Sequence, residues 1–128
     1  MKAEDLMIGS RVRYNGEICQ IAQVRSTIVL VRMRGDYTSL VPIEALSPIL
    51  LTEKLLAKNG WQEYEENEYR HKYPQGTLVA SFYQWGKEMV CSINAVNNAD
   101  VVCLCDVKYV HELQHVLSVL GVKEKFAI

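Results

Sequence analysis

The sequence predicts an α+β fold with a small β-module over residues 1–47 and a mixed helix-and-strand module over residues 48–128. The first third alternates apolar and polar residues between tight-turn signals, as short antiparallel strands do. The remainder reads as a helix, several strands and a final helix, an order typical of an antiparallel sheet with a helix packed on it. The 128 residues are 49% hydrophobic and 23% charged. Because this length and composition suit one globular domain, the two modules could also form one compact unit.

The N-terminal module is expected to be a small SH3-like β-barrel or curled meander. Asn15-Gly16 and Gly35-Asp36 are tight-turn signals, because glycine, asparagine and aspartate tolerate the left-handed backbone conformation. The opening Leu6–Val12 is similar to that of many such barrels, where an x-G-x-x-V step leads into the first strand. The expected strands are Arg11–Tyr14, Glu17–Arg25, Thr27–Arg34 and Tyr37–Ile43.

A short linking helix is expected over Glu53–Asn59. Thr52 is suited to accept a hydrogen bond from a free amide of the first turn. Leu51 can pack on Leu56 as a hydrophobic staple, and Gly60 provides the left-handed residue that ends a helix. These signals together set both ends of the helix.

The rest of the chain alternates strands and turns before a last helix. The expected strands are Trp61–Tyr64, Glu68–Tyr73, Thr77–Trp85, Glu88–Ala95 and Val101–Cys105. The last of these is apolar on both faces, which predicts a central strand, with Cys103 and Cys105 pointing to the same face. Asp106 is the expected cap of a helix over Val107–Leu120, which ends at Gly121.

Charge and composition bound the cellular setting. Fourteen Lys and Arg against fifteen Asp and Glu give a net charge of −1, so the whole chain has no strong attraction to nucleic acid or anionic lipid. No apolar run approaches the ~18 residues of a membrane span, and the acidic start Met1–Asp5 lacks an apolar signal core. We therefore expect a cytoplasmic protein without a membrane partner, whose four cysteines are reduced thiols that serve as small apolar core side chains.

One motif suggests an enzymatic alternative. The run from His111 to His115 reads H-E-x-x-H within the expected last helix. Helical spacing places the two histidines one turn apart, where both could bind one zinc ion, and Glu112 would be the general base for a zinc-bound water. The alternative function is therefore a minimal zinc-dependent hydrolase with His111 and His115 as metal ligands.

Two observations make us prefer a helix without a metal or any other cofactor. On a helical wheel the apolar residues form one arc, and His111 and His115 fall nearly opposite it, on a face expected to be solvated. Catalytic zinc normally takes three protein ligands. After His115 the sequence offers Glu124 as the lone carboxylate, and an upstream ligand such as His71 would be unusual.

Three separated blocks of the chain resemble a family of small uncharacterised proteins from Bacteroides-type genomes and their phages. The blocks are Leu6–Ile18, Pro48–Trp61 and Val107–Gly121, the last resembling the pattern Y-[VL]-H-[QE]-L-Q-N-L-Y-x-A-L-[TS]-G. In that pattern Asn usually stands at the place of His115, and Glu112 alternates with Gln, which would not serve a zinc hydrolase. The resemblance implies a phage or mobile-element context and an accessory role, with no activity to carry over.

The N-terminal module also carries a candidate nucleic-acid surface. Arg11 and Arg13 share one face of the first expected strand, and Arg32 and Arg34 share one face of the third. With Tyr14 and Tyr37 nearby as stacking platforms, these side chains could form a surface that contacts phosphates and stacks on bases. The alternative is a solvated outer face neutralised by neighbouring carboxylates.

The function we expect is that of a non-enzymatic interaction module. Its partner would be another protein, a second copy of the chain, or nucleic acid bound through the arginine face. The middle strands are rich in aromatic residues, about half of which should be exposed at a period of two, and an exposed row would favour a protein partner or self-association.

Overall fold

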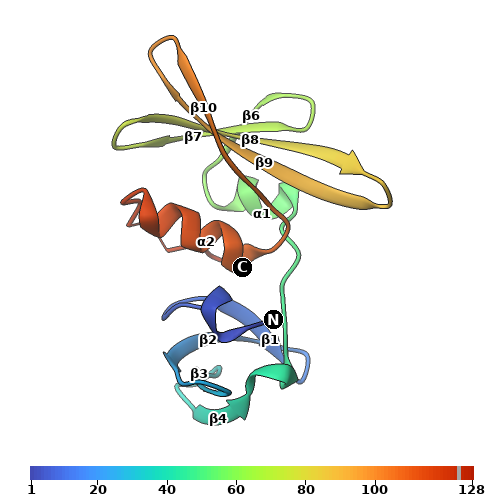
Figure 1. The fold of residues 1–128 in the computed structure, drawn as a ribbon, viewed down its shortest axis with the longest axis vertical. Helices are drawn as coiled ribbons and strands as arrows, with labels where there is room; N and C mark the ends of the chain where they lie inside the picture. The colour runs from blue at the N-terminus through green and yellow to red at the C-terminus, as the bar shows by residue number, and fades with distance from the viewer. Residues whose placement is uncertain (124) are drawn as a thin grey trace. The chain divides into compact units, whose positions relative to one another are not determined.

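The computed structural model describes residues 1–123 and 125–128, which form two antiparallel β-sheets with two α-helices and two short 3-10 helices (Figure 1). This arrangement confirms the α+β class expected from the sequence. None of the described helices is both long and apolar enough to cross a membrane.

The chain divides into two compact units, and each is described here by itself. The first comprises Met1–Leu50 and Tyr109–His115, and the second comprises Leu51–Lys108 and Val116–Ile128. The last helix, α2 (Val110–Val119), therefore contributes residues to both units.

The first unit contains a five-stranded sheet in the order β4-β3-β2-β1-β5. Within the described residues β4 and β5 are its two edges and do not pair with each other, so the sheet is not closed into a barrel. Its elements are η1 (Ala3–Asp5), β1 (Arg11–Tyr14), β2 (Glu17–Val24), β3 (Ile28–Arg32), β4 (Thr38–Pro42), η2 (Ile43–Ala45) and β5 (Leu46–Ser47).

The expected turns set the strand boundaries of this sheet. Asn15 and Gly16 have φ of 51° and 78°, and Gly35 and Asp36 have φ of 81° and 64°, so both turns use the left-handed region that their residue types favour. The first strand has the expected bounds. The third ends at Arg32, two residues earlier than expected, because the turn begins sooner.

The inward face of the first sheet builds the core of the first unit. Alternate residues of the strands point inward, as period-two patterning requires, and η1 is joined to the same core through Leu6. The buried residues are Leu6, Val12, Cys19, Ile21, Val29, Val31, Val41, Ile43 and Leu46. The opposite face of these strands is consequently free to carry polar residues.

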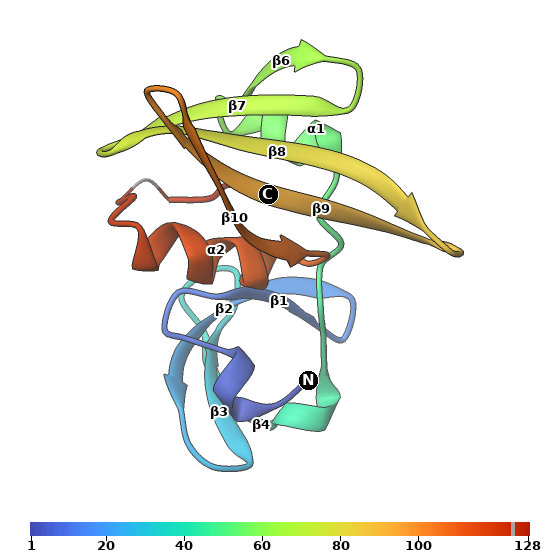
Figure 2. The same cartoon turned by 45° about the horizontal axis from the view of Figure 1, so that its top comes forward.

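The second unit contains a five-stranded sheet in the order β10-β9-β8-β7-β6, with helix α1 (Glu53–Lys58) against one face (Figure 2). The Thr52 side chain accepts a hydrogen bond from the backbone N–H of Leu55, which confirms the expected cap. The strands are β6 (Gln62–Glu65), β7 (Glu68–Tyr73), β8 (Gly76–Trp85), β9 (Glu88–Asn97) and β10 (Asp100–Val107).

Strand β10 is an edge strand, so the prediction of a central strand here was wrong. A β-bulge at Leu104 shifts the register, because Cys103 pairs with Asn94 while Cys105 pairs with Ile93. The two cysteines consequently point to opposite faces, contrary to expectation. Cys103 is exposed, whereas Cys19 and Cys91 are buried as expected.

Helix α2 begins later than the sequence suggested. Asp106 and Val107 still belong to β10, so Asp106 is not the cap of the helix. The end of the helix is as expected, because Gly121 has φ of 79° and the N–H of Val122 donates to the carbonyl of Leu117.

Candidate functional site

The two histidines of the H-E-x-x-H run lie in different environments, contrary to the prediction that both face solvent. His115 is exposed, but His111 is only 4% exposed and its ring stacks on that of Tyr109, with centroids 5.9 Å apart and planes 6° from parallel. The helical wheel placed His111 outside the apolar arc and so predicted exposure. The first half of α2 belongs to the first unit, where His111 is buried although it lies outside that arc. The two imidazoles therefore do not form one solvent-facing pair.

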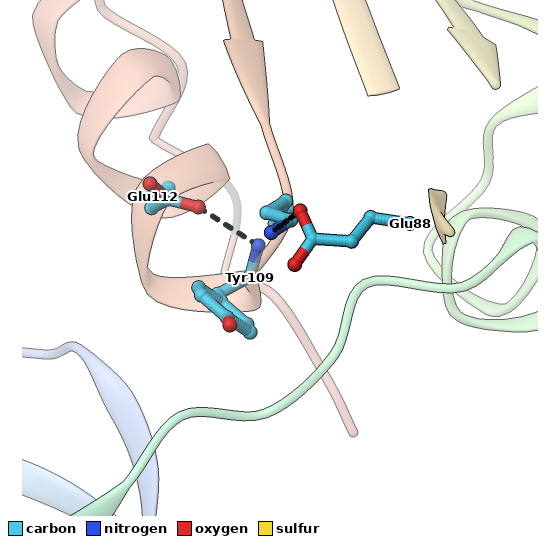
Figure 3. A network of polar contacts seen from close by, with 4 residues as sticks. Glu88, Tyr109 and Glu112 are labelled. Carbon is cyan, nitrogen blue, oxygen red and sulfur yellow. Dashed lines mark hydrogen bonds and ion pairs between the residues drawn. The ribbon is translucent and has the colours of Figure 1, made fainter. Parts of the chain in front are cut away.

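Glu112 caps the helix. The helix starts at Val110, which makes Tyr109 the capping residue and Glu112 the third helical residue. Oε1 of Glu112 accepts a hydrogen bond from the backbone N–H of Tyr109 at 3.0 Å (Figure 3). A Glu at this position commonly reaches back to the N–H of the capping residue, and a negative charge suits this end of a helix. The structure thus gives Glu112 a structural role that the motif did not indicate.

Burial also changes the chemistry of His111. Its Nδ1 is buried and has no hydrogen-bond partner among the described residues. Burial lowers the pKa of His111, against the opposing influence of Glu112 and Asp5. A neutral imidazole is a better metal ligand than a charged one, but no group of three or more His, Cys, Asp or Glu within residues 1–123 and 125–128 is arranged to hold a metal. Glu124, considered above as a ligand, lies outside the described residues.

A row of polar side chains crosses the outward face of the first sheet. Arg11 on β1 pairs with Gln20 on β2, and Gln20 pairs in turn with Arg32 on β3. Directly opposed residues of antiparallel strands point to the same face, so these three side chains lie in line. Arg13, two residues along β1 from Arg11, projects to the same face. The structure thus brings together three of the four arginines singled out in the sequence.

The fourth arginine, Arg34, is not on a strand. It lies in the turn that joins β3 to β4, beyond the end of β3 at Arg32. The prediction that Arg32 and Arg34 share a strand face was therefore wrong. Tyr37 follows the same turn and is 74% exposed. Arg34 and Tyr37 therefore flank the arginine row at one end of the sheet instead of extending it.

The arginine row has apolar neighbours on the outward face and, among the described residues, no carboxylate paired with it. Leu30 on β3 pairs with Leu40 on β4, and Leu40 is 58% exposed. Among the described residues, no Asp or Glu forms an ion pair with Arg11, Arg13 or Arg32. Ion pairs between these arginines and neighbouring carboxylates are therefore not seen in the described part of the chain. Arg13 and Arg32 are exposed on this face, and Arg11 is half-buried.

Sequence reasoning missed the residue that positions this face. Gln114 of α2 uses both ends of its side-chain amide within the first unit: Oε1 accepts from the N–H of Arg11 at 2.8 Å, and Nε2 donates to the carbonyl of Gly9 at 3.1 Å. Both bonds link residues more than 100 positions apart, so no local pattern could have indicated them. Their effect is to fix the start of β1, which carries Arg11 and Arg13.

Comparisons of the chain with protein families, with curated proteins and with solved structures gave no significant match.

Proposed function

We propose that the protein is a non-enzymatic binding module and that the outward face of its first sheet binds the phosphate backbone of nucleic acid. The cross-strand row Arg11, Gln20 and Arg32 carries the proposal, with Arg13 beside it. Guanidinium groups are planar, permanently charged and matched to phosphate oxygens, which makes arginine well suited to such a surface.

The spacing of the row suits an extended polyanion. Neighbouring strands lie about 4.8 Å apart, so the backbones of Arg11 and Arg32, two strands apart, are separated by roughly 10 Å. Arg13 lies about 7 Å from Arg11 along β1. Three cations distributed over that area can contact several phosphates of one strand. Gln20, between two of them, adds a neutral hydrogen-bonding group.

The exposed neighbours of the row favour a single strand over a duplex. Tyr37 provides an exposed ring on which a base can stack, and Leu40 adds an exposed apolar surface. Unpaired bases present such faces, whereas bases within a duplex do not. The net charge of −1 limits the attraction to this one face, so modest affinity with strong salt dependence is expected.

Two further proposals concern family and architecture. The resemblance of three sequence blocks to small proteins of Bacteroides-type genomes and their phages supports an accessory role in a phage or mobile element. The open five-stranded sheet supports an SH3-like meander as its architectural type. The zinc-hydrolase alternative is not proposed, because Glu112 caps α2 and His111 is buried against Tyr109.

Binding of a fluorescent single-stranded oligonucleotide, followed by anisotropy over a salt series, tests the proposal. Arg32→Ala should weaken binding and make the slope of log K against log salt shallower by about 0.7, the loss of one phosphate contact. Arg25→Ala is the matched control, because Arg25 belongs to the same unit and its Nη2 donates to Gln23 at 3.3 Å. Absent binding, or equal losses in both variants, would refute the proposal.

A further inference from the structure

Strand β10 leaves one edge of the second sheet open. Within the described residues, the strand order β10-β9-β8-β7-β6 gives β10 a single strand neighbour, β9 (Figure 1). Alternate backbone N–H and C=O groups of an edge strand point away from the sheet, where they can pair with another extended chain.

The side chains of β10 are of the apolar types usually found in interior strands, but several of them are exposed. Val101 is 66% exposed and Val102 is 55% exposed, and both precede the exposed Cys103. No charged side chain interrupts the run from Val101 to Cys105. Natural edge strands usually carry charges that prevent pairing with other chains. Strand β10 lacks such protection over the five residues of this run.

The opposite edge of the same sheet shows the usual protection. Strand β6 has the sequence Gln62-Glu63-Tyr64-Glu65, and all four residues are exposed. Its carboxylates would face any chain that approached this edge. The contrast between the two edges indicates that the apolar character of β10 is particular to that strand.

The charges of β10 indicate what kind of chain fits there. Asp100 and Asp106 are exposed and bracket the apolar run, and β10 contains no Lys or Arg. Pairing of two copies would bring together two strands that each carry two aspartates and no basic residue, so no favourable charge pair would form between them. A strand with a basic residue at the end that lies beside Asp100 would instead form a favourable pair with that carboxylate.

The bulge at Leu104 limits the length of the paired segment. The register with β9 is regular over Asp100–Cys103 and is interrupted before Cys105. A partner therefore has a regular edge of four residues on one side of the bulge. A short strand that pairs there can still place one basic residue next to Asp100.

We propose that β10 binds an extended segment of a partner protein, with alternating apolar residues and basic ends, which adds as a sixth strand to the second sheet. This site and its partner are distinct from the arginine face and its nucleic acid. Main-chain hydrogen bonds would provide the affinity, and Asp100 would provide the preference for a basic residue at the end of the partner strand that lies beside it.

The test uses the full chain and two synthetic peptides, Lys-Val-Thr-Val-Thr-Val-Lys and the same peptide with Glu at both ends. The basic peptide should bind and perturb the backbone amide signals of Asp100–Leu104. Val101→Lys should weaken this binding at least tenfold. Asp100→Lys should reverse the preference between the two peptides.

The control is Glu65→Lys, which makes the same charge change as Asp100→Lys but on the opposite edge of the sheet. Its affinity for each peptide should stay within twofold of that of the wild-type protein. Thermal unfolding of each variant checks that the fold is kept. Absence of peptide binding, or binding that Val101→Lys leaves unchanged, would overturn the proposal. A second outcome would also overturn it: the wild-type protein forms a dimer, Val101→Lys dissociates that dimer, and neither peptide binds. The strand paired with β10 would then belong to a second copy of the chain.

Discussion

The side-chain Oε1 of Gln114 accepts a hydrogen bond from the backbone N–H of Arg11 at 2.8 Å, across 103 positions of sequence. This bond ties the first half of α2 to the strand that carries Arg11 and Arg13. The nucleic-acid proposal therefore depends on a helix residue that contacts no ligand itself. The same hydrogen bond gives α2 a structural role in the first unit that involves no metal.

Replacement of Gln114 by Ala should lower the free energy of unfolding by about 1–3 kcal/mol. The variant leaves the N–H of Arg11 and the carbonyl of Gly9 without their partner in a half-buried place. Urea unfolding followed by circular dichroism measures the change. Ser118→Ala, at an exposed position of the same helix, should change stability by less than about 0.5 kcal/mol. Equal stabilities of the two variants would contradict the role given to Gln114.

The capping role of Glu112 distinguishes a structural from a catalytic carboxylate. Glu112→Ala should cost about 1 kcal/mol of stability, because the N–H of Tyr109 loses its acceptor. Glu112→Gln should keep most of the stability that Glu112→Ala loses, since Gln serves the same position of a capping box. Thermal unfolding of the three proteins checks the order. A Gln variant as unstable as the Ala variant would show that the hydrogen bond to Tyr109 is not what stabilises the helix start.

The buried His111 should make stability fall with acidification. Burial lowers the pKa of His111 in the folded protein below its ordinary value of 6.5, so the unfolded chain binds a proton first as the pH falls. The free energy of unfolding should decrease from about pH 7 through 6.5 until the folded group also titrates. His111→Phe keeps an aromatic ring beside Tyr109 and removes the titration, so its stability should vary less over this range.

His115 provides the control for that experiment, because it lies on the same helix but is exposed. His115→Ala should retain the pH dependence of the wild-type protein, measured by denaturant unfolding between pH 7.5 and 5.5. If His115→Ala lost the pH dependence and His111→Phe retained it, the titrating group would be His115. This result would contradict the effect assigned to the burial of His111.

The cysteines should differ in reactivity in the folded protein. Cys103 is exposed, whereas burial raises the pKa of the Cys19 thiol and raises that of Cys91 to about 12, so few of those thiols ionise near pH 8. Alkylation followed by mass spectrometry should label Cys103 first and Cys91 last. Cys103→Ser should remove the fastest phase, and denaturant should abolish the difference among the others. Labelling of Cys91 in the folded protein as rapid as that of Cys103 would contradict the burial of Cys91.

The local features of this fold were predictable because each depends on a few neighbouring residues. Asn15-Gly16 and Gly35-Asp36 occupy the left-handed region that their residue types tolerate best. Thr52 caps α1 because its side chain reaches an amide three residues along the chain. The arginines of β1 share a face because side chains alternate along any strand.

The decisive properties of the candidate sites depend on what lies beside each element. The run Val101–Cys105 reads as an interior strand, but the strand order of the second sheet places it at an edge. Likewise, the wheel of α2 placed His111 in solvent, while its packing in the first unit buries it. The pairing of Arg11 and Arg32 with Gln20 follows from sheet register. Burial and register are set by contacts between distant segments, which the pattern along one segment does not encode.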